Sequence, residues 1–266
     1  MELGEPYQRD SHGIVLRVRT GRTPAVLKVG IEVLPWPTAQ IPTLLAANGR
    51  GYVRVLEYDE SLGAVLLEQL GPSAEVDGHP PVHQATMIAE VLSEAWRVPV
   101  EVGPPRFDKA QTLMELTERL ATPEDRSRWG IALDRAALWA GELSTSADPG
   151  RDVLCHGDPH PGNLLRSISR TPTTPYVFID PDGIRCEPEY DIGVVLRGWA
   201  ANVLAANEPR EFLAGIRDTV CEITGADAER AWKWGFLERV TTGLVVRQMG
   251  EVSEAEEYLD SAMKLT

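Results

Sequence analysis

The feature that most constrains the fold is a change of hydrophobic periodicity between residues 70 and 82. Before the change, short apolar and β-branched runs are typical of strands; they occupy residues 13–20, 24–30, 52–57 and 64–70. The dipeptide Gly71-Pro72 ends this pattern. After it, apolar residues recur at helical spacing, within residues 88–96, 113–120, 131–143, 212–220 and 232–240. The sequence therefore predicts an α+β fold with a small β-rich N-lobe, residues 1–70, and a larger, mainly helical C-lobe, residues 71–266.

The net charge of the chain indicates which class of molecule it can bind. The 266 residues include 26 Lys+Arg and 40 Asp+Glu, a net charge of −14, of which −13 falls in residues 70–266. Nucleic acids require clustered cationic side chains, so we expect no nucleic-acid partner. The balance instead suits a cationic small molecule.

The lengths of the apolar runs and the number of cysteines indicate the cellular compartment of the protein. No run reaches the roughly 18 apolar residues of a membrane span, and the first ten residues lack the apolar stretch of a signal peptide. Three scattered cysteines do not form a disulfide framework or a zinc site; they are Cys155, Cys186 and Cys221. We therefore expect a cytoplasmic protein without a membrane partner, and the oligomeric state stays open.

Four polar residues have spacings that match one chemical task. In the octapeptide HGDPHPGN, Asp158 lies five residues before Asn163, and Asp180 follows the apolar run Val-Phe-Ile seventeen residues after Asn163. Upstream, Lys28 lies inside the predicted strand Ala-Val-Leu-Lys-Val. Taken alone, an Asp and an Asn at this spacing belong more often to a solvent-exposed turn than to an active site. Together with Asp180 and Lys28, the pattern indicates a phosphoryl-transfer site of the kinase type.

Phosphoryl transfer explains why these residue types are needed. One carboxylate must orient the attacking hydroxyl, while a second carboxylate and an amide oxygen offer ligands to a hard cation such as Mg²⁺. A fixed lysine balances the charge of the nucleotide phosphates.

The motifs resemble those of the aminoglycoside phosphotransferases. HGDPHPGN, FIDPDG and EYDIG occur in that order, and GEPYQRDSHG, GRGYVRVLEYD and LLEQLGP look closest to the streptomycin and hydroxyurea phosphotransferase group. The resemblance spans nearly the whole chain. It implies the bilobal fold of protein kinases, with ATP and Mg²⁺ as cofactors.

The resemblance also implies roles for the four polar residues. Asp158 would be the catalytic base. Asn163 and Asp180 would bind Mg²⁺, and Lys28 would bind the ATP phosphates.

Further residues would support that site. By the same resemblance, His156 braces the catalytic loop, and Asp191 does so from the start of the following helix. Glu68 and Leu70 bound the hinge that offers backbone groups to adenine.

Two departures from the family pattern stand out. No glycine-rich loop precedes Lys28, so residues 10–13 are the candidate cover for the phosphates. The next helix is predicted near residues 43–48, after three prolines. Counting back along it puts Gln40 near the place of the glutamate that usually orients the lysine, and Glu32 is the closest acid in sequence. The partner of Lys28 is therefore open.

Several nearby residues have simpler interpretations. His156 and His160 are spaced like a metal-binding pair on a helix, but Pro159 prevents that helix, so a structural role is expected for His156. Glu187 and Glu189 are candidates for a cationic acceptor's cleft, with a solvent-facing position the favoured alternative. Asp182 is expected to cap a turn.

The leading hypothesis is an ATP- and Mg²⁺-dependent O-phosphotransferase acting on an aminoglycoside-type antibiotic, with streptomycin first. Another acceptor, such as hydroxyurea or a metabolite, is the alternative within the same chemistry. A nucleotide-binding pseudokinase that serves as an interaction module is the alternative outside it.

Overall fold

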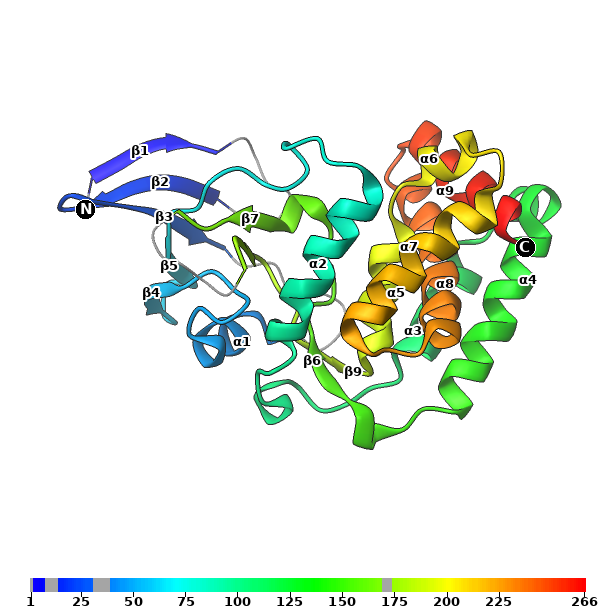
Figure 1. Ribbon diagram of the computed structural model, residues 1–266, viewed down its shortest axis with the longest axis horizontal. Coiled ribbons are helices and arrows are strands. Elements are labelled where there is room, and N and C mark those ends of the chain that lie inside the picture. Colours follow the sequence, from blue (N-terminus) through cyan, green and yellow to red (C-terminus); the bar gives the residue numbers. More distant parts are fainter. Residues whose placement is uncertain (1, 8–13, 31–38, 169–173) are drawn as a thin grey trace.

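A five-stranded antiparallel sheet forms one end of the molecule (Figure 1). The computed structural model describes residues 2–7, 14–30, 39–168 and 174–266. The strand order is β1-β2-β3-β5-β4, for β1 Glu2–Pro6, β2 Ile14–Thr20, β3 Thr23–Val29, β4 Val55–Asp59 and β5 Ala64–Glu68. The strands predicted at 13–20, 24–30 and 64–70 are confirmed.

The residues at one turn and at one edge of this sheet explain how its first three strands pair. Gly21, with a φ of +63°, makes the tight turn that pairs Thr20 with Thr23 across the predicted hairpin. Strand β1 was not anticipated, because Glu-Leu-Gly-Glu-Pro has little strand propensity; it lies at the edge, where Pro6 is tolerated. The strand predicted at 52–57 begins later, since Tyr52 instead makes an isolated bridge to Phe178.

Nine helices lie within the described residues, and all but the first belong to the larger, C-terminal part (Figure 1). They are α1 Gln40–Ala47, α2 Pro81–Ala95, α3 Lys109–Leu120, α4 Pro123–Thr145, α5 Pro188–Arg197, α6 Ala200–Ala205, α7 Pro209–Thr224, α8 Ala228–Gln248 and α9 Val252–Leu265. Prolines occupy the first turn of four of them, α2, α4, α5 and α7, where the missing N–H would have no partner within the helix. None of the described helices is long and apolar enough to cross a membrane.

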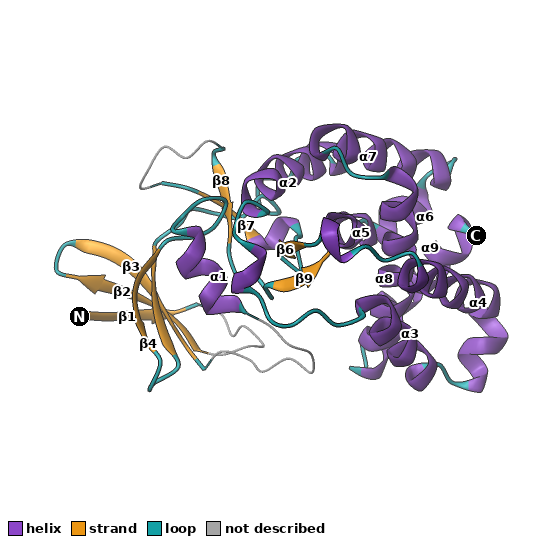
Figure 2. Cartoon of the chain, turned by 90° about the horizontal axis from the view of Figure 1, so that it is seen from below, coloured by secondary structure: helices purple, strands orange, loops and turns teal. Residues whose placement is uncertain are grey.

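Two small antiparallel pairs of strands lie between the five-stranded sheet and the C-terminal helices (Figure 2). Strand β6 Val153–Cys155 pairs with β9 Ile184–Cys186, and β7 Leu164–Arg166 pairs with β8 Tyr176–Phe178. Because β6 leads to β7 and β8 leads to β9, this pairing brings the two connecting turns together. Those turns contain the motifs identified in the sequence.

One hydrophobic core runs through both parts of the molecule. It includes Leu44 and Val65 from the N-terminal side together with Ile88, Phe178 and Leu237 from the C-terminal side. The predicted architecture of a β-rich N-lobe and a helical C-lobe is therefore confirmed, while the exact boundary at residue 70 stays a prediction.

Helices α5 and α8 cross at the centre of the C-terminal part through two glycines. A Cβ added to Gly193 would lie 2.4 Å from Trp234 Cβ and 2.8 Å from the Gly235 nitrogen. A Cβ on Gly235 would in turn lie 2.8 Å from Leu196 Cβ. The absence of side chains at this crossing is what lets the two backbones approach.

We expect Gly193→Ala to lower the free energy of unfolding by about 1–3 kcal/mol, the usual cost of overpacking a core. The control is Gly215→Ala in α7, where an added Cβ meets nothing within 4 Å; better helix propensity should raise stability there by about 0.5–1 kcal/mol. Urea unfolding of both variants measures this. Equal effects of the two substitutions would contradict the close crossing.

Candidate active site

The two motif turns meet beside the paired short strands. The catalytic-loop turn joins β6 to β7 and contains Asp158 and Asn163, and the second turn joins β8 to β9 and contains Asp180. The Ile179 N–H donates to the carbonyl of Asn163 at 2.9 Å, and the Asp182 N–H donates to the carbonyl of His156 at 2.6 Å. These two hydrogen bonds thus join residues that are 16 and 26 positions apart in the sequence.

A buried carboxylate holds the catalytic loop from behind. Asp191, in the first turn of α5, accepts hydrogen bonds at 2.8 Å from the backbone N–H of His156, the backbone N–H of Gly157 and the indole N–H of Trp96. Burial raises the pKa of Asp191 to about 6, against the three hydrogen bonds, which lower it. The carboxylate therefore fixes the loop backbone from its first two residues.

His156 links the two turns in one tautomer. Its Nδ1 accepts the N–H of Asp158 at 3.1 Å, so the ring proton belongs on Nε2, which lies 2.9 Å from the carbonyl oxygen of Ile179. Burial lowers the pKa of His156 to about 4, so the ring is neutral near pH 7. A neutral, fully buried ring with both nitrogens used fits a bracing function and leaves no nitrogen for a metal.

The Asp158 carboxylate remains 40% exposed while both of its oxygens have partners. Arg197 Nη2 donates to Oδ1, and His160 Nε2 lies 3.5 Å from Oδ2. Because the His160 Nδ1 accepts the Gly162 N–H at 3.1 Å, its Nε2 is the nitrogen that carries a proton toward Asp158. Burial alone would raise the pKa of Asp158, but the charge of Arg197 and the His160 hydrogen bond outweigh it and hold this pKa below its ordinary value.

Sequence reasoning missed Arg197. This residue, in the last turn of α5, lies between Asp158 and Glu238 of α8, with its Nη1 3.4 Å from Glu238 Oε2. Its partner Asp158 is 39 residues earlier in the chain, so no local pattern points to the contact.

Asp182, expected to cap a turn, also lies beside this group. A Cβ on Gly157 would be 2.6 Å from Asp182 Oδ2, and burial together with the charge of Asp158 raises the pKa of Asp182 to about 7. Its backbone carbonyl accepts the N–H of Ala39 at 2.8 Å, which ties the turn to the start of α1.

The two hydrogen-bonded turns each contain a side chain whose oxygen could bind a hard cation, Asn163 in the first and Asp180 in the second. Asn163 Nδ2 donates to the carbonyl of Asp158 at 3.1 Å, which leaves its Oδ1 as the amide atom for a cation. Asp180 has a φ of +51°, a left-handed conformation that non-glycine residues adopt mainly where a site requires it. One carboxylate and one amide oxygen fit Mg²⁺, which keeps several waters or phosphate oxygens as its remaining ligands.

Lys28 bonds directly to Asp180, with Nζ 2.8 Å from Oδ1 and only 6% of the lysine side chain exposed. Among the described residues, Asp180 is therefore the partner of Lys28 that the sequence left open. Helix α1, with the sequence QIPTLLAA, begins at Gln40 and contains no acid. Glu32 and residues 10–13 lie outside the described residues.

A slot of about 430 Å³ opens between the five-stranded sheet and the short strands, and Lys28 and Asp180 are among its lining residues. Its walls are mainly aliphatic; it is lined by Tyr7, Val15, Val26, Lys28, Val53, Leu67, Glu68, Leu70, Gly71, Leu165, Ile179 and Asp180. Glu68 is held in place because its Oε1 accepts the Arg54 N–H at 2.9 Å. Both residues expected to bound the hinge, Glu68 and Leu70, thus line the slot.

Glu187 and Glu189 are a correction to the sequence interpretation. Both are buried rather than solvent-facing, at 4% and 0% exposed. Glu187 accepts hydrogen bonds from Arg230 and from the Trp234 indole, and Glu189 pairs with Arg151. Their charge is used to hold helices together.

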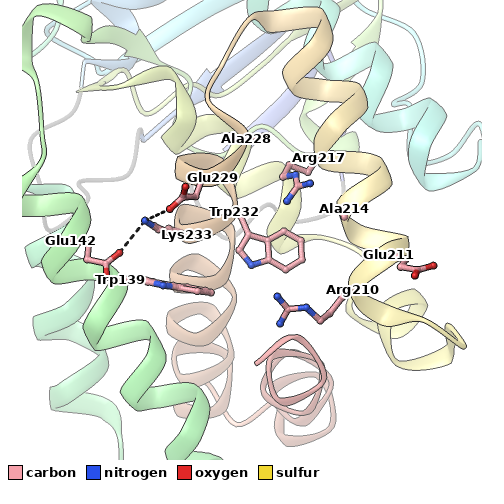
Figure 3. A pocket seen from close by; sticks show the side chains of 10 residues that line it. All are labelled: Trp139, Glu142, Arg210, Glu211, Ala214, Arg217, Ala228, Glu229, Trp232 and Lys233. Atoms are coloured by element: carbon pink, nitrogen blue, oxygen red, sulfur yellow. Dashed lines mark ion pairs between the residues drawn. The ribbon is translucent and has the colours of Figure 1, made fainter.

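A second pocket of about 700 Å³ lies among α4, α7 and α8 (Figure 3). Its charges are partnered locally: Lys233 pairs with Glu142 at 3.0 Å and with Glu229 at 2.7 Å. Arg210 and Arg217 lie over the Trp232 ring, 5.7 and 5.4 Å from its centroid. These contacts join α7 to α8, so we assign this pocket to helix packing.

Comparison with known proteins decides the family. The family described as "Aminoglycoside/hydroxyurea antibiotic resistance kinase" matches residues 2–250. The chain belongs to this family. It is 28% identical to a streptomycin 6-kinase of Streptomyces glaucescens over 82% of the chain and 69% of that protein. It is 30% identical to a hydroxyurea phosphotransferase of Kitasatospora aureofaciens over 96% of the chain and 72% of that protein.

The fold is also that of a solved kinase-like enzyme. A spectinomycin phosphotransferase, crystallised with ADP and spectinomycin, superimposes with a TM-score of 0.60 at 14% identity, over 98% of this chain and 87% of the other. Identity this low supports the shared fold alone. The kinase-like bilobal architecture expected from the motifs is thereby confirmed.

We expect Arg197→Met to move the acidic limb of the kcat/KM profile to higher pH, by about 1–3 pH units. Removing the guanidinium removes the charge that lowers the pKa of Asp158, while burial still raises it. The Asp158 carboxylate is then protonated at pH values where that of the wild type is ionised. Arg197→Lys retains the charge and should keep the limb near its original position. Superimposable profiles for all three proteins would contradict this electrostatic assignment.

Proposed function

We propose that the chain transfers the γ-phosphoryl group of ATP, with Mg²⁺, to a hydroxyl of an aminoglycoside-type antibiotic, with streptomycin as the first acceptor to test. The observation that carries the proposal is the juxtaposition around one slot. Lys28 and Asp180 line it, and the backbone hydrogen bond from Ile179 to Asn163 joins the Asp180 turn to the loop of the partly exposed Asp158. This set provides a cation for phosphates, oxygen ligands for a metal and a carboxylate for an attacking hydroxyl.

In this proposal, the chain's residues divide the work by position. Asp158 accepts a hydrogen bond from the acceptor hydroxyl and takes its proton as the bond to phosphorus forms. Arg197 and His160 hold the two carboxylate oxygens in place, so that the carboxylate is oriented before the acceptor binds. Lys28 exchanges Asp180 for nucleotide phosphate oxygens. Mg²⁺ held by Asn163 and Asp180 would neutralise phosphate charge in the transition state.

The acceptor is inferred from the relatives. Two matched proteins are named for streptomycin and hydroxyurea, at 28% and 30% identity. A cationic acceptor agrees with the net charge of −13 in residues 70–266. Streptomycin is therefore the first choice, and hydroxyurea the second.

The test is an ADP-release assay with purified protein, Mg·ATP and a panel that includes streptomycin, other aminoglycosides, spectinomycin and hydroxyurea. Acceptor-dependent ADP release with streptomycin, and a phosphorylated product by mass spectrometry, are expected. Release with hydroxyurea alone would move the acceptor to the second choice. Nucleotide binding with no transfer to any acceptor would favour the pseudokinase interpretation.

Asp158→Asn should lower kcat by about 10²- to 10⁴-fold, because a base acts chiefly in the transition state. The affinity for ATP should stay close to that of the wild type, since Asp158 does not line the slot. Single-turnover kinetics and calorimetric ATP titration measure the two quantities. Wild-type turnover in this variant would show that another group is the base.

The KM for a cationic acceptor should rise clearly between low and high ionic strength, while the KM for Mg·ATP changes less. Salt screens the attraction of the acidic C-terminal part for a cation, with a Debye length of about 10 Å at 0.1 M. Initial rates at several salt concentrations measure this. An acceptor KM that does not vary with salt would argue for a neutral acceptor such as hydroxyurea.

A further inference from the structure

We propose that Arg239 is a positioning residue for phosphoryl transfer, because it fixes the end of α5 in the shape that brings Arg197 against Asp158. The inference rests on the proposed function, in which Asp158 is the base. Arg239 lies within α8, and its hydrogen bonds go to the end of α5 and to α9. It does not line the slot, so we expect it to act on the reaction through Arg197.

Arg239 is a fully buried cation whose hydrogen bonds go to uncharged groups. Its side chain is 0% exposed. Nη2 donates to the carbonyl oxygens of Leu196 at 2.7 Å and of Gly198 at 3.0 Å, and Nη1 donates to the Ser261 hydroxyl at 2.7 Å. Burial lowers the pKa of Arg239 to about 10, so the guanidinium is charged near pH 7. Because a buried charge is costly without polar partners, the guanidinium and the two carbonyls hold one another in place.

The two carbonyls flank Arg197 at the point where α5 ends. The last carbonyls of a helix have no partner inside the helix and carry partial negative charge, so a cation stabilises them. The next residue, Trp199, has a φ of +57°, a left-handed conformation that a residue with a Cβ adopts only where its surroundings require it. Arg239 therefore stabilises a sharp turn of the chain directly after Arg197.

Two consecutive residues of α8 hold Arg197 at different points. Glu238 Oε2 lies 3.4 Å from Arg197 Nη1, while Arg239 binds the carbonyls on both sides of the Arg197 backbone. With its backbone and one nitrogen fixed in this way, Arg197 directs Nη2 to Asp158 Oδ1. Without the backbone restraint, the long Arg197 side chain would be held by carboxylates alone and would sample other positions.

Arg239→Met is the first test. The kcat should fall about tenfold, because a displaced Arg197 leaves the Asp158 carboxylate less well oriented. The Kd for ATP should stay near that of the wild type, since Arg239 is outside the slot. Calorimetric titration gives both this Kd and the fraction of protein that binds ATP, to which kcat is normalised. Arg239→Lys retains the charge without the planar fork, so it should fold more readily and lose about threefold in kcat.

The matched control is Arg247→Met. Arg247 lies two turns later on α8 and pairs with the buried Asp125 of α4, with 3.2 Å between Nε and Oδ1. Its removal should destabilise the protein but leave kcat unchanged. Equal losses of kcat in Arg239→Met and Arg247→Met would show that Arg239 acts only through general stability, and would overturn the proposal.

A double-mutant cycle tests whether Arg239 acts through Arg197. In an Arg197→Met background, Arg239→Met should lower kcat by less than about twofold, because the effects of residues that act through one another are not additive. The same tenfold loss in both backgrounds would overturn the assignment.

Nitrogen-15 NMR of the arginine side chains tests the positioning without any acceptor. The Arg197 signals are assigned by their loss in Arg197→Lys. In the wild type, Nη1 and Nη2 should give separate signals, because Glu238 and Asp158 restrict rotation of the guanidinium. In Arg239→Met, or in Arg239→Lys if the former does not fold, the two signals should broaden or merge.

The outcomes separate this proposal from the proposed function. Unchanged, separate Arg197 signals in the Arg239 variants would overturn the positioning assignment, even if the wild type phosphorylates an acceptor. A wild type that phosphorylates no acceptor would overturn the proposed function. Merged signals in the Arg239 variants would then still support the hold of Arg239 on Arg197, and unchanged signals would overturn it.

Discussion

The buried carboxylate of Asp191 is the constraint on which the catalytic loop depends. It gathers three N–H donors from two separate segments of the chain, the loop at residues 156 and 157 and the indole of Trp96. Removing the carboxylate would leave three buried donors without acceptors, each at a cost of about 1–3 kcal/mol. The loop shape that presents Asp158 is thus set from the interior, before any ligand binds.

From Asp191 a continuous set of contacts leads to the five-stranded sheet. The loop residue His156 bonds to the carbonyl of Ile179, and the next residue, Asp180, bonds to Lys28 of β3. In the family pattern, a glutamate on the following helix usually orients the lysine. Here α1 contacts the same turn through its backbone, with the Ala39 N–H on Asp182, and Asp180 orients the lysine. The two lobes are therefore coupled through the turn that contains Asp180.

The juxtaposition of the two motif turns could be predicted from the sequence because it depends on local spacing. The interval from Asp158 to Asn163 and the apolar run before Asp180 are each encoded within one turn and its flanking strand, and the resemblance supplied their order. The contact of Arg197 and the presence of β1 could not be predicted. Arg197 acts on a partner 39 residues away, and β1 pairs by backbone alone at a sheet edge, where weak strand propensity is no obstacle.

The acidic charge of the C-terminal part shows why composition cannot replace geometry. Several of its acids are buried against arginines, including Asp125 on Arg247, Asp152 on Arg106 and Arg185, and the pairs of Glu187 and Glu189. Such pairs contribute little field at a distance, because each charge is compensated within a few ångströms. Any attraction for the proposed cationic acceptor must therefore come from acids near Asp158 that are not fully compensated. Asp158, Asp182, Asp191 and Glu238 lie around Arg197 and the buried Lys109, so these acids outnumber these cations when all are ionised. The pKa of Asp182, raised to about 7, makes that excess depend on pH.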